Sequence, residues 1–249
     1  MTTPCLVLPF AVADGPANMA LDEALLDEVA EDPTHAVLRT YGWSSPTLSL
    51  GYFQKVADAE ADPRWRDAQI VRRPTGGGAI WHHHEITYAV VLPGDHALSR
   101  PGGDLYRATH SAIVAVINAQ GIAAGRRGAS PESFTGDRPF LCFTDRNPED
   151  IVSGGFKLVG SSQRRRSGAL LQHGSVLLVR SAMIPSLAGL DDLSPIRKDV
   201  NSWSELLLGS IPVALGLLAR PSDVSGPARR RAEDLRRDVY RDPSWTRRR

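Results

Sequence analysis

Residues 72–92 read Arg-Arg-Pro-Thr-Gly-Gly-Gly-Ala-Ile-Trp-His-His-His-Glu-Ile-Thr-Tyr-Ala-Val-Val-Leu. The glycine run 76–78 allows positive φ and lets a ligand approach the main chain closely. Two arginines end the apolar run before the glycines, and the alternation over 86–92 predicts a strand. This pattern of strand, basic pair, glycine loop and strand suits a substrate with a polar or anionic group beside an apolar part. The alternative is a plain glycine turn in a hairpin.

This loop lacks the features of the common nucleotide and metal sites. No Gly-Lys-Ser/Thr follows it, and its glycines do not have the Gly-x-Gly-x-x-Gly spacing. Neighbouring residues on a strand face opposite sides, so at most His82 and His84 of the three consecutive histidines could share a ligand. Catalytic zinc usually takes three protein ligands, and no metal site is therefore predicted.

Length and composition indicate one large globular domain spanning residues 1–249. The chain is 42% hydrophobic and 23% charged, which suits a substantial core. A net charge of +1 gives no strong bias toward nucleic acid or an anionic membrane, and no apolar run approaches the ~20 residues of a membrane helix. The N-terminus lacks the pattern of a signal peptide. We therefore expect a cytoplasmic protein without a nucleic-acid or membrane partner, and no structural disulfide between Cys5 and Cys142.

Hydrophobic periodicity gives a coarse order of elements. Apolar spacing predicts helices over 16–30 and 104–120. Strands are expected over 3–11, 36–41, 48–52, 68–71, 86–92, 151–160 and 169–178. Residues 125–139 are polar and rich in turn formers, which predicts a long loop. Further helices are expected over 213–218 and 228–239, within a basic tail (about 220–249) that is either helical or partly disordered.

Four sequence blocks resemble one family. Residues 72–88 are similar to the signature of the lipoate/biotin protein ligase superfamily, Arg-Arg-x-Thr/Ser-Gly-Gly-Gly/Arg-Ala-Val-x-His. Residues 155–175 resemble its Gly-x-Lys-hydrophobic-x-Gly-Ser-Ala-Gln-Arg and Leu-Gln-His-Gly-Ser motifs, and residues 18–26 and 48–54 also resemble family blocks. The resemblance covers about 18–178 in the right order. It implies an α+β catalytic domain with a mixed sheet and flanking helices around an acyl tunnel.

The resemblance also implies roles for individual residues. Cys142, in Leu141-Cys142-Phe143, would by itself be interpreted as a buried small hydrophobe. The family's octanoyltransferases, however, carry Cys-Phe at this distance before the motif lysine and use the cysteine as nucleophile. Lys157 is then expected to hold the acyl carbonyl oxygen and stabilise developing negative charge, unless it is only a surface lysine. Substrate-binding roles are implied for Arg72, Arg73, Thr75, Gly76, Gly77, Gly78, His82, Gly160, Ser161, Gln163 and His173.

Two mechanisms fit the family, and a third reading is a non-catalytic acyl-binding member. In the first, a cysteine takes an octanoyl group from acyl-carrier protein and passes it to a lysine of a lipoyl domain or a glycine cleavage H protein-like acceptor, without a cofactor. In the second, a ligase uses ATP and Mg²⁺ to make lipoyl-AMP. Gly78 favours the ligase, because cysteine-type octanoyltransferases often have arginine there. An octanoyltransferase is favoured by Cys142 and by the little room for a second C-terminal domain, and it is our prediction. We also expect the enzyme to be a monomer.

Overall fold

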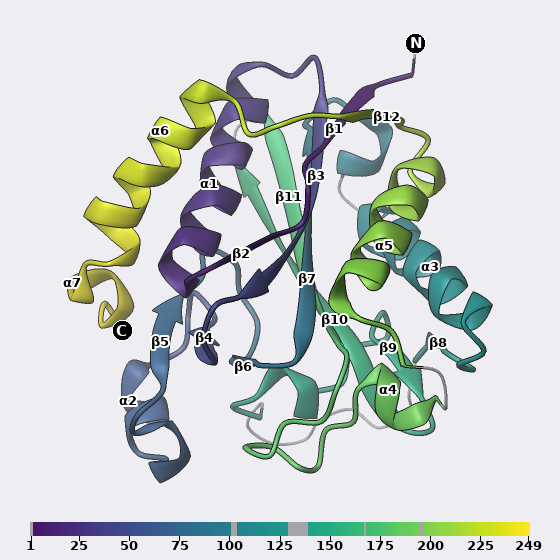
Figure 1. Cartoon of the computed structure of the whole chain (residues 1–249). Coiled ribbons are helices and arrows are strands. Elements are labelled where there is room, and N and C mark those ends of the chain that lie inside the picture. The colour runs from purple at the N-terminus through teal and green to yellow at the C-terminus, as the bar shows by residue number, and fades with distance from the viewer. Residues whose placement is uncertain (1, 101–103, 129–138, 167, 195–196) are drawn as a thin grey trace.

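The structure is a computed structural model that describes residues 2–100, 104–128, 139–166, 168–194 and 197–249. A nine-stranded mixed sheet forms its centre, with the strand order β12-β1-β3-β7-β11-β10-β9-β8 and β2 paired beside β3. A separate sheet has the order β5-β4-β6 (Figure 1). The predicted α+β fold with a mixed sheet and flanking helices is therefore confirmed. Most of the loop predicted over 125–139 lies outside the described residues.

The strand bounds follow the chain order. They are β1 (Pro4–Val7), β2 (Ala11–Ala13), β3 (Ala36–Trp43), β4 (Thr47–Leu50), β5 (Gln69–Arg72), β6 (Ile80–His82), β7 (Glu85–Pro93), β8 (Gly125–Arg126), β9 (Ile151–Ser153), β10 (Phe156–Arg166), β11 (Ala169–Leu177) and β12 (Leu218–Pro221). Strands β3, β7, β11 and β10 pair antiparallel in turn, whereas β1 is parallel to both β3 and β12.

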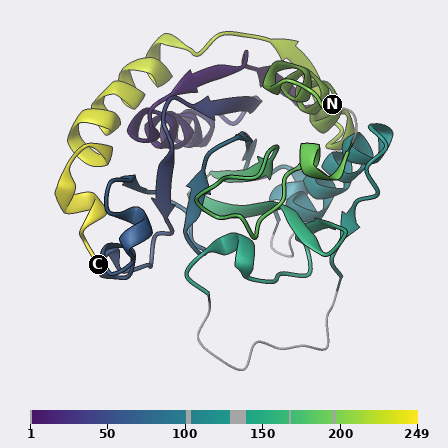
Figure 2. The same ribbon diagram turned by 60° about the horizontal axis from the view of Figure 1, so that its bottom comes forward.

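Helices cover both faces of the large sheet. They are α1 (Gly15–Glu31), α2 (Val56–Glu60), α3 (Asp104–Ala119), α4 (Leu190–Leu193), α5 (Val200–Ala214), α6 (Gly226–Leu235) and α7 (Pro243–Thr246). One core lies between the sheet and α3 and α5, and another between the sheet and α1. Helix α6 packs outside α1, so that α1 is enclosed between α6 and the sheet (Figure 2). None of the described helices is long and apolar enough to cross a membrane.

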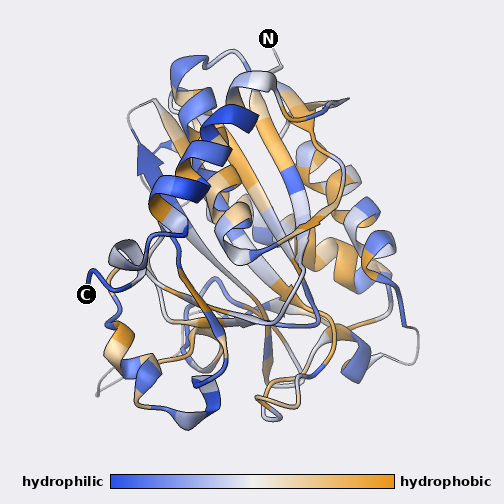
Figure 3. Cartoon of the chain, turned by 60° about the vertical axis from the view of Figure 1, so that its left-hand side comes forward, coloured by the Kyte–Doolittle hydropathy of each residue, from blue (hydrophilic) through white to orange (hydrophobic). Residues whose placement is uncertain are grey.

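Hydropathy follows this layering. The central strands are apolar, and the outward side of α6 is strongly hydrophilic (Figure 3). Leu25, Leu26 and Val29 of α1 are buried against the sheet, as expected from their helical spacing. The expected helix within the basic tail is observed as α6, which continues into a π-helical turn over Arg236–Tyr240.

Three predicted elements are corrected by the structure. The first strand divides into β1 and β2, which pair one after the other along the same edge of β3, opposite β7. The strand expected over 151–160 breaks at Gly154 and Gly155, whose positive φ values of 54° and 85° make the tight turn between β9 and β10. The helix expected over 213–218 is wrong, because α5 starts at Val200 and the chain enters β12 at Leu218.

The glycine run does not form a hairpin turn. Strand β5 lies parallel to β4, and β6 lies antiparallel on the other side of β4. The segment between them therefore crosses β4, which rules out the hairpin alternative. The histidine run is also not a continuous strand: β6 ends at His82, and His84 adopts a positive φ of 54° in the turn before β7.

Candidate active site

A narrow cavity lies where the two sheets meet. Its walls come from α1, β3, β6, β7, β10, β11 and two loops. It is lined by Met19, Tyr41, Trp43, Arg73, Gly77, Ile80, His82, Thr87, Cys142, Gly160, Ser161, Ser162, His173, Gly174 and Ser175. Only about 30 Å³ admits the centre of a water-sized molecule. The cavity is therefore a slender, mainly apolar slot with a few polar groups on its walls.

Cys142 is fixed to the glycine segment through the main chain. It begins a short 3₁₀ turn, η3 (Cys142–Thr144), and its N–H donates to the Ala79 carbonyl at 2.8 Å. The Ala79 N–H in turn donates to the Phe140 carbonyl at 2.7 Å. These two bonds join the segments as a small parallel bridge. Cys142 remains half-buried, whereas Cys5 is fully buried and desolvation raises its pKa to about 12.

Lys157 brings a positive charge to Cys142. Its Nζ lies 3.7 Å from Cys142 Sγ and donates to the Cys142 carbonyl at 2.8 Å. A side-chain carbon on Gly160 would lie 2.8 Å from Lys157 Cε and 3.6 Å from Cys142 Sγ, so the glycine keeps this space open. The Lys157 ammonium therefore lies beside the sulfur of the predicted nucleophile.

Asp150 holds Lys157 in place from the other side. The Lys157 Nζ to Asp150 Oδ1 distance is 2.9 Å, and both side chains are buried. Burial raises the pKa of Asp150, and the charge of Lys157 opposes that shift. The lysine is therefore not a surface residue of a hairpin, but half of a buried ion pair next to the cysteine.

Arg73 shapes the glycine segment. Its guanidinium donates to the carbonyls of Gly76 and Gly78, at 2.8 Å and 2.7 Å, and to the Ser49 carbonyl and hydroxyl. Arg73 is 3% exposed, and burial lowers its pKa to about 10. All of these acceptors are neutral, so a buried positive charge at the cavity wall has no carboxylate partner among the described residues. A thiolate or an oxyanion in the cavity would compensate it.

His82 is held by polar partners on both ring nitrogens. Its Nδ1 lies 2.8 Å from Glu85 Oε1 and its Nε2 lies 2.7 Å from Ser49 Oγ. A carboxylate only accepts, so Nδ1 donates to Glu85. The ring also stacks on Trp43 with centroids 3.7 Å apart. Burial lowers the pKa of His82, and this favours the neutral ring.

His173 has an equivalent arrangement with Asp22. Its Nδ1 donates to Asp22 Oδ2 at 2.8 Å, and its Nε2 lies 2.7 Å from Thr75 Oγ1, which also accepts from Ser162. Within the described residues neither His82 nor His173 hydrogen-bonds to Cys142, and both nitrogens of each ring have other partners. We interpret both histidines as positioning residues rather than as a base for the cysteine.

Asp22 anchors this network, and its replacement tests it. Although burial alone raises the pKa of Asp22, Arg39 and His173 hold it below the ordinary value. Asp22→Asn should cost about 3–5 kcal/mol at pH 7, because it leaves buried Arg39 without its charge partner. A carboxyl whose pKa is lower in the folded state stabilises the folded protein fully at pH values above its pKa in the unfolded chain. This stabilisation is lost as the pH falls through the pKa of the folded state. The deficit in denaturant unfolding should therefore shrink below about pH 4. An equal effect of Asp67→Asn, at an exposed position, would contradict this.

The structure brings only some of the predicted residues to the cavity wall. These are Cys142, Arg73, Gly77, His82, Gly160, Ser161 and His173. Four other predicted residues do not line the cavity but contact residues that do. These are Thr75, Gly76, Gly78 and Lys157. Gln163 instead pairs with Gln172 at 2.8 Å. The prediction that Arg72 lines the site is wrong, because its guanidinium points away to the carbonyls of Gly51, Gln54 and Thr246.

Four residues of the site were missed by sequence reasoning. Asp22, Glu85 and Asp150 are the buried carboxylates that hold His173, His82 and Lys157. Trp43 stacks on His82 and lines the cavity. One signal was present for Asp22: it lies four residues after Asn18 on the same face of α1, and the structure shows both to be buried.

Gly78 touches the cysteine directly, and this contact makes a prediction. A side-chain carbon on Gly78 would lie 2.8 Å from Cys142 N and 3.1 Å from its Cα, which is closer than such atoms approach. Gly78→Ala should therefore displace Cys142 and lower acyl transfer roughly 10²-fold. The matched control is Gly76→Ala, whose new carbon would meet only the Phe53 ring at 3.9 Å. Equal steady-state rates for the two variants would show that the contact is unimportant.

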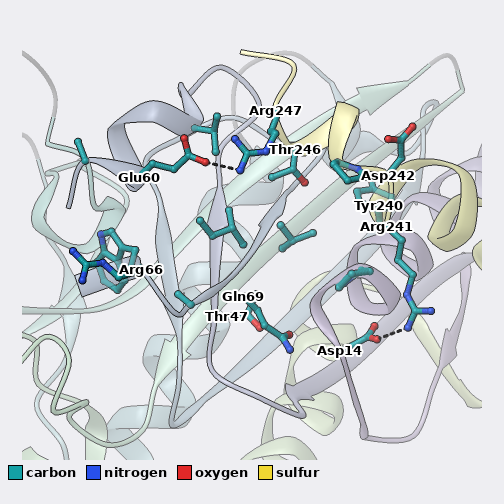
Figure 4. Close-up of a pocket in the computed structure, with 18 of the residues that line it drawn as sticks. Asp14, Thr47, Glu60, Arg66, Gln69, Tyr240, Arg241, Asp242, Thr246 and Arg247 are labelled. Carbon is teal, nitrogen blue, oxygen red and sulfur yellow. Dashed lines mark hydrogen bonds and ion pairs between the residues drawn. The ribbon is translucent and has the colours of Figure 1, made fainter. Parts of the chain in front are cut away.

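A larger groove lies away from this cavity. It has a volume of about 1020 Å³ and runs between edge strand β5, α2 and the C-terminal α7. Ion pairs Glu60–Arg247 and Asp14–Arg241 cross its ends (Figure 4). No cysteine or histidine lines it. Among the described residues no cluster of histidine, cysteine and acidic side chains is placed to hold a metal ion.

Comparison with known proteins gives a consistent match. Residues 14–197 match the model of the lipoyl protein ligase A/B catalytic domain. The octanoyltransferase LipM of Moorella thermoacetica is 43% identical over 180 residues, which cover 69% of this chain and 64% of that protein. The octanoyltransferase LipM of Geobacillus kaustophilus is 31% identical over 257 residues, which cover 92% of each chain. The chain thus spans less than two thirds of the first relative and nearly all of the second.

Solved structures agree on the fold. The crystal structure of lipoate-protein ligase A bound with ATP has a TM-score of 0.80, with 21% identity over 99% of this chain and 98% of that one. A bipartite lipoate protein ligase from Thermoplasma acidophilum, solved in a study of that enzyme and its E2 lipoyl domain, has a TM-score of 0.75 at 19% identity. At these identities the likeness concerns the fold alone.

Proposed function

Because the chain belongs to the lipoyl protein ligase A/B catalytic domain family, we propose that it is an octanoyltransferase acting through a thioester on Cys142. The observation that carries this proposal is the 3.7 Å distance between Lys157 Nζ and Cys142 Sγ at the wall of the narrow apolar cavity. The octanoyltransferase relatives support the same activity.

The proposed reaction is two successive acyl transfers. The Cys142 thiolate attacks the thioester carbonyl of an octanoyl donor, an S–C bond forms, and the donor thiolate leaves. The ε-amine of an acceptor lysine then attacks the new thioester, the amide bond forms, and the Cys142 thiolate leaves as the amine loses its proton to solvent. In both steps the carbonyl oxygen becomes negative, and Lys157 and Arg73 supply the nearby positive charge.

The cavity suits an unbranched acyl chain whose entry is accompanied by movement of a lining side chain. The cavity is a narrow, mainly apolar slot, so a wall side chain that can change its conformation would help an eight-carbon chain to enter. Met19 is buried on the cavity wall, and an unbranched thioether side chain adapts its shape readily. We infer that Met19 swings aside when the acyl group enters.

The proposal implies particular partners and cofactors. The expected donor is acyl-carrier protein, and the acceptor is a lipoyl domain or a related H protein-like domain. No nucleotide or metal is needed, because the donor thioester already supplies an activated acyl group. We also infer that the enzyme works in the cytoplasm as a monomer.

Paired assays test the proposed function. Octanoyl-acyl-carrier protein without ATP should modify a lipoyl domain, as followed by intact mass. Free lipoate with ATP and Mg²⁺ should not modify the lipoyl domain. Modification only in the second mixture would replace the octanoyltransferase with an ATP-dependent ligase, and modification in neither would leave a non-catalytic acyl-binding protein.

A further inference from the structure

Three arginines gather around two aromatic side chains beside the glycine segment. We name Arg164, Arg248, Arg249, Tyr52 and Phe53 the basic rim. The guanidinium carbons of Arg164 and Arg248 lie 5.3 Å and 4.6 Å from the Tyr52 ring centre, and that of Arg249 lies 5.4 Å from the Phe53 ring centre. Phe53 is 68% exposed. Three segments far apart in sequence therefore meet in one basic and aromatic surface.

The C-terminal part of the rim is held firmly. Trp245 Nε1 donates to the Arg72 carbonyl at 2.9 Å, and the Arg72 guanidinium donates to the Thr246 carbonyl at 2.7 Å. The Arg247–Glu60 pair fixes the same segment across the large groove (Figure 4). The Val56 N–H donates to the Arg249 carbonyl at 3.0 Å. Arg72, which is absent from the cavity, therefore serves to anchor the rim.

The rim cations lack acidic partners. Within the described residues none of Arg164, Arg248 and Arg249 forms an ion pair with an aspartate or glutamate, whereas Arg247 does. Burial, followed by the charges of Arg248 and Arg249, lowers the pKa of Arg72. The rim is thus a surface of uncompensated positive charge, and such a surface attracts an acidic partner.

The rim also lies next to the proposed reaction site. The Phe53 ring is 3.9 Å from where a side-chain carbon of Gly76 would be. The next residue, Gly77, lines the cavity together with Cys142. A protein seated on the rim would therefore present its own surface groups close to the cavity.

We propose that the basic rim receives the acidic surface around the acceptor lysine of the carrier domain. This rests on the proposed octanoyl transfer. A lysine reaches its target through a four-carbon stem only, so the acceptor surface must contact the enzyme close to the cavity. An acyl-carrier donor delivers its thioester on a long prosthetic arm and does not need this adjacent surface. Exposed aromatic and arginine side chains are also the residue types enriched where proteins bind one another.

Charge reversal separates the two half-reactions. Arg248→Glu/Arg249→Glu and, separately, Arg164→Glu should raise KM for a lipoyl domain roughly tenfold at low salt, with a smaller difference at high salt. Acylation of Cys142 by octanoyl-coenzyme A, measured by intact mass, should keep its wild-type rate. The matched control is Arg229→Glu/Arg230→Glu, which makes the same charge change at exposed positions of α6.

The other outcomes have defined meanings. Unchanged KM in both rim variants, or an equal rise in the α6 control, would overturn the proposal. Slower acylation by octanoyl-acyl-carrier protein with normal transfer to the lipoyl domain would assign the rim to the donor and also overturn it. Failure of the wild-type enzyme to form any Cys142 adduct would instead reject the proposed function. Far-ultraviolet circular dichroism and thermal unfolding check that the variants fold.

Discussion

Replacement of Cys142 by alanine is expected to abolish octanoyl transfer while leaving the fold intact. The side chain is half-buried and lies beside a small apolar cluster and the Lys157 ammonium, so its removal costs little packing. Without the sulfur no thioester can form, and the acceptor lysine would have to attack the donor directly. With octanoyl-acyl-carrier protein and no ATP, the wild-type enzyme should gain one octanoyl mass that hydroxylamine removes, and peptide mapping should place it on Cys142.

The second cysteine provides the control. Cys5 is fully buried in β1, and desolvation raises its pKa to about 12, so it should not be acylated. Cys5→Ala should retain the adduct and most of the transfer rate. If Cys142→Ala still transfers lipoate in the presence of ATP and the wild-type enzyme forms no adduct, the nucleophile is wrongly assigned. An adduct on Cys5 would contradict the proposal equally.

The local sequence predicted the elements that have a strong hydrophobic period. It did not predict the features that depend on which distant strands pair with one another. Helix α1 and strands β7 and β11 follow from apolar spacing, because each buries one stripe or both faces. The spacing around the glycine run could not show that β5 and β6 lie on opposite sides of β4. A hairpin and a crossover have the same local signals, and only the choice of partner strand separates them.

The site shows a similar limit. The motif blocks indicated Cys142, Lys157 and both histidines, but not the carboxylates behind them. Asp22 lies on a helix far in sequence from His173, and Asp150 meets Lys157 only because the chain turns back between β9 and β10, so both roles depend on tertiary contacts. The two arginines before the glycines look equivalent in sequence. On a strand end they point to opposite sides, and one holds the glycine carbonyls while the other holds the C-terminal segment.

Replacement of Lys157 by methionine is the second change expected to have a large effect. Losing a charge that stabilises a developing oxyanion typically lowers the rate roughly 10²–10³-fold. The variant should also lose stability, by about 3–5 kcal/mol at neutral pH, because buried Asp150 is left without its partner. Single-turnover acylation of Cys142 and denaturant unfolding measure the two effects separately.

The buried Lys157–Asp150 pair also determines how the stability of Lys157→Met should depend on pH. It supplies the control variant for the same experiment. Burial raises the pKa of Asp150 even beside Lys157, and removing the lysine should raise it further. A carboxyl with a raised folded pKa binds more protons in the folded state, so stability falls as pH rises. The deficit of Lys157→Met should therefore be larger at pH 8 than at pH 5. Lys157→Met/Asp150→Asn should recover most of the stability and none of the acylation rate. Recovery of the rate as well would mean that Lys157 acts only by neutralising Asp150, and not on the acyl group.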